Sequence, residues 1–417
     1  MSNQNFVVSM NSSLHRIKLA LVAHRFEIGG LERCMATLVN SLPNDIVEPM
    51  VIAFDGECAA AEWITKENVK VASLKKGFPN DPRLALQLAR TLREHEIDIV
   101  HSHNWGSLVE SGIASRLCRI PHVHAEHGLE FNQNEQGWRG KIKPILKRRF
   151  FRKASALVAI ADCVKRRLSG VYGIDSGRVT LIPNGVPKPS VGDRERNYCE
   201  VRQRLGLPGD ARIAGTVGRA AHVKGFDNAI RAFHPLANQS SKNHLVIVGG
   251  GGEIDRLREL SNKLLIHEQV HLVGHQLDVG FWLSGFDLFF NSSRSEAMNL
   301  AVIEAMAVGL PIVAMDVGDN AVMVQKHMKC GLVAQQGDID EFTRLLEIGL
   351  GDRGLSAEWG ANSLAVYQSH YSVDKMTHAY LSLYQQLVAP RHPEIGGKLS
   401  TQFSGHSETV REFDPNG

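Results

Sequence analysis

A chain of 417 residues, 43% hydrophobic and 22% charged, has the composition of a globular protein of two or three domains. The net charge of +3 is too small to indicate nucleic-acid binding, and we expect no nucleic-acid partner. The six cysteines are scattered and form no C-x-x-C pair, which argues against a disulfide framework or a zinc site and favours a reduced compartment.

Neither a membrane span nor a secretion signal is predicted. No apolar run approaches the roughly 20 residues that a spanning helix needs. The first ten residues contain no basic segment followed by an apolar core. We therefore expect a cytoplasmic protein with a flexible N-terminus over residues 1–15.

The first half of the chain alternates between strand and helix patterns. Alternation at this spacing predicts parallel βαβ units and hence a doubly wound sheet, so we expect a first Rossmann-like domain over residues 16–187. The predicted strands are 16–23, 47–54, 97–101, 123–125, 156–161 and 179–182, and the predicted helices are 31–42, 82–95, 107–119 and 162–168.

The turn after the first strand contains Gly29 and Gly30. A strand, a glycine turn and a helix let backbone amides approach a phosphate, but this is no G-x-G-x-x-G motif, and an ordinary tight turn explains it equally well. Five histidines, at 101, 103, 122, 124 and 127, suggest a metal site. They lie on two strands without a matching carboxylate or cysteine pattern, which disfavours metal. We expect His127, at a strand end before Gly128, to face the ligand.

Residues 139–153 carry eight basic side chains, and no acid occurs from Gln136 to Ala161. Such a patch can hold a protein peripherally on an anionic membrane, here the inner face of the cell membrane. The cations spread around a helical wheel, so we expect surface electrostatics and no deep insertion. A solvated face or contacts to an anionic acceptor remain alternatives.

The second half repeats the alternation after a stretch rich in Pro, Gly and charge that is typical of a linker. We expect a second Rossmann-like domain over 188–370, a C-terminal helix within 371–389, and a disordered tail over 390–417. The predicted strands are 212–217, 244–248, 270–273, 288–290, 312–315 and 333–335.

The strongest functional signal lies in residues 291–320, a strand–helix–strand unit. Glu296 precedes the helix and Glu304 lies inside it. We expect the free amides of Asn299, Leu300 and Ala301 to lie between them at the positive end of the helix dipole, where a phosphate binds readily. An acid such as Glu304 among apolar neighbours is costly unless it binds something.

Two cations near one strand end of the second half can hold a diphosphate. Arg219 follows Gly218 at a strand end, and Lys224 lies five residues further on. Two solvated cations are the alternative, although Lys224 near a helix N-terminus is unfavourable unless a ligand compensates it. Asp338-Ile339-Asp340 looks like a metal-binding D-x-D, but it precedes a helix and is better explained as an N-cap with a first-turn acid. We predict no metal site.

Taken in order, these motifs resemble the retaining glycosyltransferases of family 4, which have the GT-B fold. That fold consists of two Rossmann-like domains that face a cleft, and we expect the C-terminal helix to return to the first domain. The resemblance covers about residues 17–387. The motifs that carry it are Glu296-x7-Glu304, Gly29-Gly30-Leu31-Glu32, His101-Ser102-His103, Glu126-His127-Gly128, Pro183-Asn184-Gly185-Val186, Gly218-Arg219, Lys224-Gly225 and Gly249-Gly250-Gly251-Gly252.

The resemblance implies roles for single residues. Arg219 and Lys224 would hold the diphosphate of a nucleotide diphosphate sugar, Glu304 its ribose and Glu296 its sugar. No metal or other cofactor would be needed. Gly29 and Gly30 would close over the diphosphate from the first domain, and His127 would face the sugar and the acceptor. The remaining donor-binding residues would be Gly218, Gly249, Gly250, His275, Met298, Asn299, Leu300 and Ala301.

The sequence departs from the family pattern at Ala297, Met298 and Asn299, where many members have Gly-Phe-Gly. Because of this difference, the resemblance does not identify the donor sugar. The implied reaction is sugar transfer with retention of configuration to a sugar, glycolipid or lipid-linked acceptor, in polysaccharide or glycolipid biosynthesis. The G-G-L-E-R segment at 29–33 and the E-H-G-x-E segment at 126–130 are most similar to bacterial exopolysaccharide-associated transferases. A sugar-nucleotide epimerase on the same fold and a degenerate, non-catalytic binding protein are the alternatives.

Overall fold

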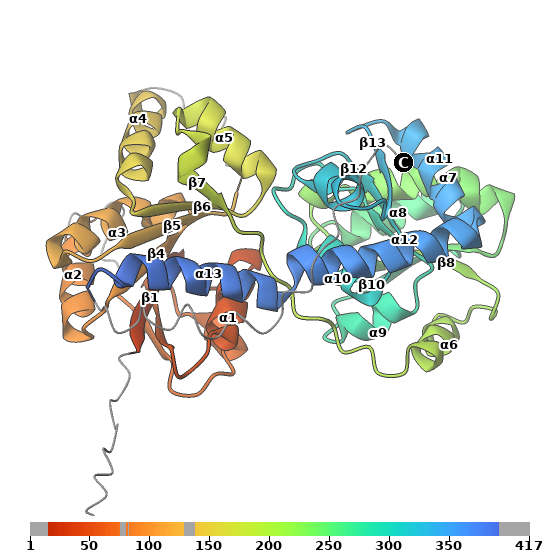
Figure 1. Cartoon of the computed structure of the whole chain (residues 1–417). Coiled ribbons are helices and arrows are strands. Elements are labelled where there is room, and N and C mark those ends of the chain that lie inside the picture. Colours follow the sequence, from red (N-terminus) through yellow and green to blue (C-terminus); the bar gives the residue numbers. More distant parts are fainter. Residues whose placement is uncertain (1–15, 76–80, 82, 129–137, 392–417) are drawn as a thin grey trace, which may run out of the picture.

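Seven parallel strands form the sheet of the first domain, in the order β3-β2-β1-β4-β5-β6-β7. The computed structural model describes residues 16–75, 81, 83–128 and 138–391 (Figure 1). The predictions for 1–15 and for most of the tail lie outside these residues. The strands are β1 (Ile17–Arg25), β2 (Val47–Asp55), β3 (Lys70–Ser73), β4 (Ile99–His103), β5 (His122–Glu126), β6 (Ala156–Ala159) and β7 (Val179–Leu181).

Helices cover both faces of this sheet, which explains why the strands are continuous apolar runs in the sequence. In β1, for example, every residue from Leu19 to Ala23 is fully buried. The connecting elements are α1 (Gly30–Ser41), η1 (Ala59–Trp63), α2 (Leu84–Glu94), α3 (Trp105–Cys118), α4 (Trp138–Lys153), α5 (Asp162–Tyr172) and η2 (Ser176–Arg178).

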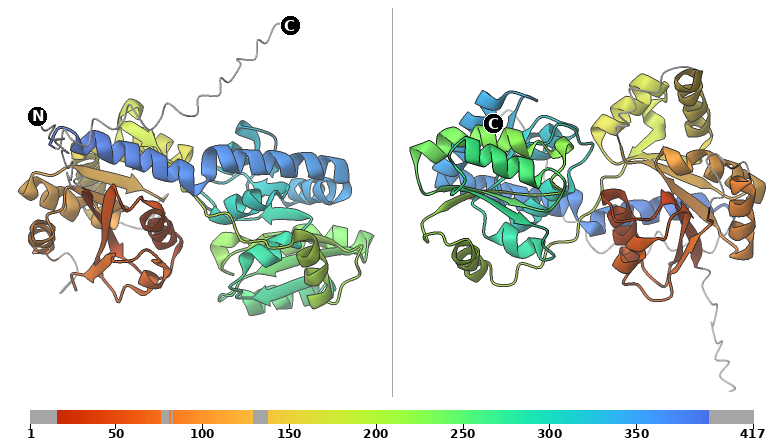
Figure 2. Two further views of the ribbon diagram at one scale, coloured as in Figure 1. Left: turned by 60° about the horizontal axis from the view of Figure 1, so that its bottom comes forward. Right: turned by 180° about the vertical axis from the view of Figure 1, so that it is seen from behind.

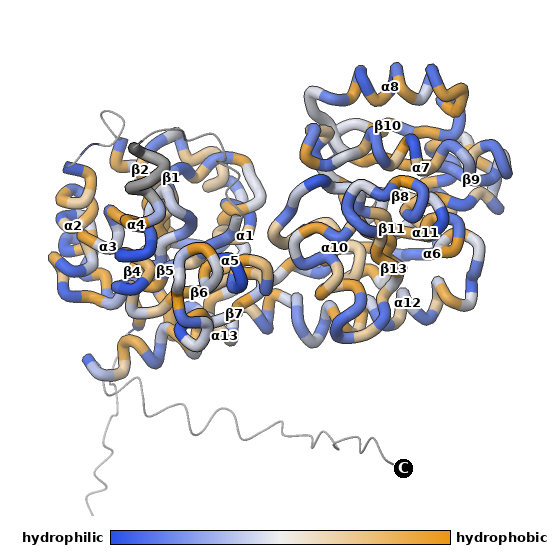
Figure 3. Tube along the Cα trace, turned by 90° about the horizontal axis from the view of Figure 1, so that it is seen from above, coloured by the Kyte–Doolittle hydropathy of each residue, from blue (hydrophilic) through white to orange (hydrophobic). Residues whose placement is uncertain are grey.

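Six parallel strands form the second sheet, in the order β10-β9-β8-β11-β12-β13. Figure 3 shows the outer helix α8 (Ile254–Lys263) alternating between hydrophilic and hydrophobic residues, as expected for a helix with one solvated face. The strands are β8 (Arg212–Val217), β9 (Asn243–Val248), β10 (Val270–Gly274), β11 (Leu288–Asn291), β12 (Ile312–Met315) and β13 (Gly331–Ala334).

Further helices connect these strands and complete the second half of the chain. They are α6 (Arg194–Arg204), η3 (His222–Lys224), α7 (Phe226–Gln239), α9 (Val279–Ser284), α10 (Leu300–Val308), η4 (Val322–Lys326), α11 (Ile339–Gly351), α12 (Arg353–Val366), η5 (Tyr367–Tyr371) and α13 (Val373–Val388).

The last helix, α13, leaves the second domain and packs against the first (Figures 1 and 2). Its buried side chains Met376, Tyr380, Tyr384 and Val388 join the apolar core beside β1, α1 and β5. The Tyr384 hydroxyl lies 2.7 Å from Nδ1 of His101 in β4. The predicted GT-B architecture, with two parallel sheets and a returning C-terminal helix, is confirmed.

The two chain crossings between the domains lie side by side. The amide of Val186 donates to the carbonyl of Tyr371 over 3.0 Å, and the two crossings form an isolated parallel bridge. Gly185 is required here because a Cβ would lie 2.8 Å from the Cα of Val373. The Pro-Asn-Gly-Val motif therefore serves the packing of α13 against the linker.

Several element predictions need correction. The strand predicted at 97–101 lies at Ile99–His103, so the histidines belong to the strand itself. The short strand β3 and the helices α6 and α9 were not predicted. α6 begins at Arg194, inside the stretch expected to be linker, because Asp193 accepts a hydrogen bond from the Arg196 amide and caps a helix with little apolar pattern.

Candidate active site

The first turn of α10 is contacted by the Gly-Gly turn of the other domain. A Cβ on Gly30 would lie 3.9 Å from Cδ1 of Leu300. Gly29 is the N-cap of α1, and a Cβ there would lie 2.4 Å from Oε2 of Glu32. The glycine turn thus brings backbone from the carboxyl end of β1 close to the start of a helix in the second domain. That Gly29 and Gly30 close over a diphosphate stays a prediction.

Glu296 is held by a cation and a hydroxyl before α10 begins. Lys224 Nζ lies 2.5 Å from Glu296 Oε1, and the Ser293 hydroxyl donates to the same oxygen over 3.0 Å. Both charged side chains are largely shielded, with 23% of Lys224 and 16% of Glu296 exposed. The sequence predicted both residues for the site, but not their ion pair. Lys224 was expected to need a ligand for charge compensation, and here Glu296 of the same domain provides the compensating charge.

Gly225 sets the position of Lys224. Its φ is +62°, and a Cβ would lie 2.1 Å from the carbonyl oxygen of Ser292, so only glycine fits without a shift. Arg294 ties the same two loops together. Its guanidinium holds Asp227 through two contacts of 2.8 Å. Arg294 and Asp227 were missed by the sequence analysis because nothing in their spacing indicates that they meet.

Arg219 is exposed, and within the described part of the chain no hydrogen bond or ion pair holds its guanidinium. Its neighbours are glycines at the ends of three strands. A Cβ on Gly249 would lie 1.9 Å from the Gly218 carbonyl oxygen, and a Cβ on Gly250 would lie 3.6 Å from Cβ of the exposed His275. Four residues that the sequence predicted for the site therefore lie together at the carboxyl edge of the second sheet: Gly218, Gly249, Gly250 and His275.

Glu304 lies inside α10 and is paired with a residue of the other domain. Arg33 Nη2 of α1 lies 2.9 Å from Glu304 Oε1. Only 6% of the Glu304 side chain is exposed, against 51% of Arg33. Burial raises the pKa of Glu304, and the Arg33 guanidinium opposes this rise. The sequence predicted that Glu304 must bind something, but Arg33 was not in the predicted site.

The helix start of α10 differs from the prediction in one respect. Asn299 is its N-cap, and its side chain accepts a hydrogen bond from the Ala301 amide over 3.0 Å. The expectation that Ala301 offers a free amide is therefore wrong, because an asparagine cap satisfies it. Met298 is buried, with 9% exposed. The amides of Met298, Asn299 and Leu300 remain predicted ligand contacts.

The histidines form hydrogen-bonded networks on the two faces of the first sheet. On one face, His103 Nδ1 lies 2.9 Å from His127 Nε2. On the other, the Ser102 hydroxyl lies 2.7 Å from His122 Nε2 and 2.8 Å from His124 Nδ1. Within the described residues, no group of three or more His, Cys, Asp or Glu side chains is placed to hold a metal ion.

The D-x-D sequence is part of a helix start, as predicted. Asp338 is the N-cap of α11 and accepts a hydrogen bond from the Glu341 amide over 2.8 Å. Asp340 lies in the first turn of the same helix, where an acid interacts favourably with the helix dipole.

A second contact joins the domains beside α10. Asp319 follows β12, and its carboxylate accepts hydrogen bonds from the amides of Asp162 and Cys163 at the start of α5, the latter over 2.8 Å. The Asp319 amide donates to the Ala297 carbonyl over 3.1 Å. Asp319 thus connects the loop before α10 to a helix of the first domain, and the sequence offered no signal for it.

Two family models match the chain in succession. "Glycosyltransferase Family 4" matches residues 28–188, and "Glycosyl transferases group 1" matches residues 198–365. The chain belongs to glycosyltransferase family 4. It is a GT-B glycosyltransferase, and the predicted family and enzyme class are confirmed.

Relatives of the transferase are also glycosyltransferases by name. A D-inositol 3-phosphate glycosyltransferase of Salinispora arenicola is 29% identical over 317 residues, which cover 71% of this chain and 70% of that protein. A Bacillus subtilis protein, TuaC, named for teichuronic acid biosynthesis, is 28% identical over 251 residues, 59% of this chain and 60% of that protein.

Among solved structures, HepE of Anabaena in complex with UDP superposes with a TM-score of 0.77 at 21% identity, covering 89% of this chain and 100% of that one. The same protein was also solved with UDP-glucose. At this identity the likeness shows the fold of the transferase.

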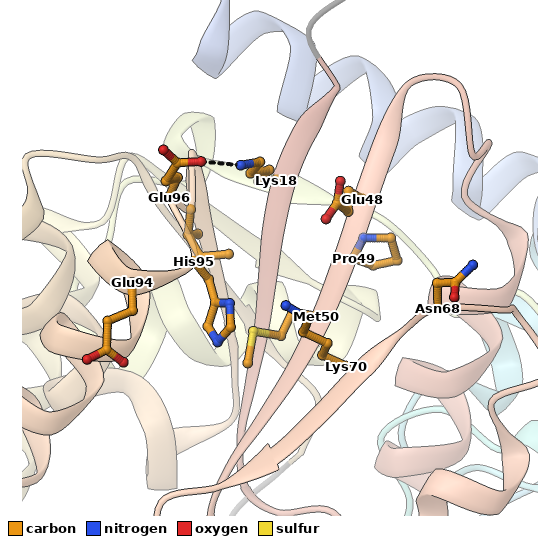
Figure 4. Close-up of a pocket in the computed structure, with 10 residues that line it drawn as sticks. Lys18, Glu48, Pro49, Met50, Asn68, Lys70, Glu94, His95 and Glu96 are labelled. Carbon is orange, nitrogen blue, oxygen red and sulfur yellow. Dashed lines mark hydrogen bonds and ion pairs between the residues drawn. The ribbon is translucent and has the colours of Figure 1, made fainter.

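Two hollows of the transferase are lined by residues outside the α10 loop. One, of about 180 Å³, opens at the amino ends of β1 and β2, with Lys18, His95 and Glu96 on its wall (Figure 4). The other lies beside Gly128 and is lined by Glu126 and Lys147. Ligands of open α/β sheets bind at the carboxyl ends of the strands, so the first hollow is not the expected site.

We predict that Arg33→Gln moves the pH dependence of UDP binding to higher pH. A carboxylate must be ionised to accept two ribose hydrogen bonds, so affinity should fall as pH falls through the pKa of Glu304. Arg33 lowers that pKa, and its loss should make the fall begin at a higher pH. Calorimetric titration with UDP from neutral to acidic pH measures this.

Arg25→Gln is the control, because it removes an exposed arginine of the same domain that pairs with Asp55. Its pH profile should match that of the unmodified transferase. An Arg33→Gln profile with an unchanged or lower midpoint would contradict the assignment.

Proposed function

We propose that the transferase moves a sugar from a nucleotide diphosphate sugar to an acceptor hydroxyl, with retention of configuration at the anomeric carbon. The observation that carries this is the arrangement of cations and glycines around the start of α10. Arg219 follows the end of β8, Lys224 ends the short helix η3 that comes after it, and Gly30 approaches Leu300 from the other domain.

The chemistry requires stabilisation of the leaving diphosphate. Positive charge develops on the sugar and negative charge on the phosphate oxygens as the glycosidic bond breaks. Arg219 is exposed and Lys224 is held within the loop, so both are placed to meet that negative charge. Lys224 is held by its ion pair with Glu296, and a preorganised cation contributes more than a flexible one, since it needs less rearrangement during the reaction.

Glu296 is the proposed contact of the donor sugar. Its Oε1 atom now accepts from Lys224 and Ser293, and Asn299 Nδ2 lies 3.5 Å away. When a diphosphate attracts Lys224, Glu296 can accept hydrogen bonds from sugar hydroxyls instead. Met298 and Asn299, which stand where many members have Phe and Gly, follow this carboxylate in the chain and are proposed to select the sugar.

Glu304 is the proposed ribose contact, with one oxygen held by Arg33 and the other available. UDP and UDP-glucose complexes of HepE support a uridine nucleotide as the first donor to test. The name of TuaC and the presence of a lipopolysaccharide biosynthesis enzyme, WaaG, among structures of the same fold support a polysaccharide or glycolipid acceptor. TuaC and WaaG are both named as transferases, which favours transfer over epimerisation.

We predict that Lys224→Met lowers kcat/KM for sugar transfer by about a hundredfold, because it removes a preorganised charge from the leaving group. The assay is a panel of nucleotide sugars scored for transfer and for hydrolysis. Lys242→Met is the matched control, since Lys242 also pairs with an acid, Asp210, but on the surface of the second domain. If kcat/KM falls equally in both variants, or falls in neither, Lys224 does not stabilise the leaving group.

The proposed reaction requires no metal, because Arg219 and Lys224 supply the positive charge and Asp338 is committed to capping α11. We predict that prior treatment with a chelator leaves the initial rate of transfer unchanged. The measurement compares the treated enzyme before and after Mg²⁺ or Mn²⁺ is added back. Restoration of activity only by the added ion would contradict the proposal.

We also propose that the α3–α4 surface contacts anionic lipid. Arg148, Arg149, Arg152 and Lys153 of α4 are exposed, whereas Lys147 is buried and does not belong to the surface patch that the sequence predicted. Nearby like charges, Arg149 first and then Arg116 of α3, lower the pKa of Lys153, which supports one concentrated patch.

Exposed apolar side chains on both helices would let this surface rest at the lipid interface. They are Ile113, Leu117 and Ile145. Within the described residues, no helix is both long enough and apolar enough to cross a bilayer.

We predict that vesicles containing anionic lipid sediment with the transferase at low salt and release it at high salt. Replacing Arg116, Arg149 and Lys153 together by Gln should weaken this binding by about a hundredfold, given ~1 kcal/mol per cation. The control replaces Arg231, Arg258 and Lys263 of the second domain, which changes the net charge equally. Equal binding of both triple variants, or binding to neutral vesicles, would refute the proposal.

A further inference from the structure

The first turn of α5 is capped by a residue of the other domain. Asp319, which follows β12, accepts hydrogen bonds from the amides of Asp162 and Cys163, and its side chain is only 7% exposed. Ala161 is the N-cap residue of α5, and its methyl group cannot accept a hydrogen bond. These two amides therefore have Asp319 as their partner only while the second domain lies against α5.

A carboxylate suits this cap better than a neutral amide side chain. The amide of Asp162 donates to Oδ2 of Asp319 and the amide of Cys163 donates to Oδ1, so both oxygens accept a hydrogen bond. An asparagine would offer one oxygen and would turn its amino group toward the other donor. The negative charge also lies at the positive end of the helix dipole, and Arg166 Nη2 of the same helix lies 3.9 Å from Oδ1.

The turn that carries Asp319 packs directly against the loop before α10. Gly318 has a φ of +60°, and a Cβ there would lie 2.4 Å from the carbonyl oxygen of Glu296. The Ala297 carbonyl accepts from the Asp319 amide over 3.1 Å and from the Cys163 thiol over 3.4 Å. Burial, and then the charge of Asp319, raises the pKa of Cys163 to about 12, so the sulfur keeps its proton at neutral pH and can donate. The backbone next to Glu296 is thus contacted from both domains.

Buried side chains connect the same turn to the carboxylate of Glu296. Asn320, which is fully buried, donates from Nδ2 to Oδ1 of Asn291 over 2.9 Å. Nδ2 of Asn291 donates to the Ser293 hydroxyl over 3.3 Å, and that hydroxyl donates to Oε1 of Glu296 over 3.0 Å. Hydrogen bonds therefore lead from the residue after Asp319 to the carboxylate that is proposed to contact the donor sugar.

We propose that Asp319 is a positioning residue for sugar transfer, which fixes the 318–320 turn by capping α5 and thereby holds Glu296 in place for the donor sugar. The carboxylate of Asp319 contacts the first domain, and the backbone of the same residue supports the loop of the second. The approach of the two domains and the geometry of Glu296 are therefore coupled. The inference rests on the proposed function for the role of Glu296.

Asp319→Asn tests the cap from the second domain. This variant keeps one acceptor oxygen and the backbone amide that contacts Ala297, but it cannot accept from both amides of α5. We expect kcat for transfer to fall about tenfold, with little change in the KM for the donor, because Arg219 and Lys224 are not altered. An unchanged kcat would overturn the inference.

Asp162→Pro tests the same contact from the first domain, without altering any residue of the second. Proline is favourable at the first position of a helix, and the extended backbone of Ala161 suits a following proline. The substitution removes the N–H that donates to Asp319, so kcat should again fall about tenfold. Asp162→Asn is the matched control, because it keeps the amide and removes only the ion pair with Lys326, and it should leave kcat unchanged. Equal kcat values in the two variants would contradict the proposed coupling.

A cap from the same domain as α5 separates stability from positioning. Ala161→Ser introduces a hydroxyl at the N-cap, which can accept from an amide of the first turn. Combined with Asp319→Asn, it should raise Tm toward that of the unmodified protein but leave kcat low. If kcat recovers together with Tm, Asp319 only stabilises α5 and the inference is wrong.

Amide hydrogen exchange measures the coupling without a substrate. In the full-length protein, Asp319→Asn should speed exchange at the start of α5 and also in the loop 296–299, whereas exchange in β6 should not change. Mass spectrometry of proteolytic fragments follows the three segments separately. Faster exchange at the start of α5 alone would show that the loop does not depend on the cap, and would overturn the coupling.

The outcomes separate this inference from the proposed function. If no nucleotide sugar supports transfer but both segments exchange faster in Asp319→Asn, the proposed function has failed and the coupling has not. If transfer occurs and neither segment responds, the coupling has failed and the proposed function has not. If Asp319→Asn does not fold, kcat and hydrogen exchange of Asp162→Pro and Asp162→Asn still decide.

Discussion

Two carboxylates that are shielded from water at the start of α10 require cations as partners. Their ion pairs bring together residues from both domains. Glu296 is paired with Lys224 of its own domain, and Glu304 with Arg33 of the other. A buried carboxylate without a partner would shift its pKa and lose its charge. The donor-binding half of the site is therefore complete only when α1 of the first domain lies against it.

The parallel strands explain why these groups meet. In both sheets the carboxyl ends of the strands point toward the same junction, so Gly30, His127, Gly218 and Glu296 all follow strand ends. Glycines let the loops approach closely, as at Gly225 against Ser292. Asp319 adds a hydrogen-bonded contact between the loop before α10 and α5, and α13 ties the second domain to the core of the first.

Much of the fold was predictable because strand and helix periodicities are local. The bounds of β8 and β12 match the prediction, and α10 ends at Gly309, whose φ of +78° suits a glycine. The short strand β3 and the polar helix α6 were missed because neither has a clear apolar pattern. The site prediction failed where distant segments meet, at Arg33 and Asp319, and where Asn299 caps the amide of Ala301.

By itself, the sequence determined the two parallel-sheet domains, the family, and the positions of Arg219 and Glu296 after strand ends and of Glu304 inside a helix, because local spacing encodes these. Only the tertiary structure decided which charges are paired, since ion pairs such as Arg33 with Glu304 join segments that are far apart in the chain. It likewise decided that His103 and His127 touch, because β4 and β5 are neighbours in the sheet.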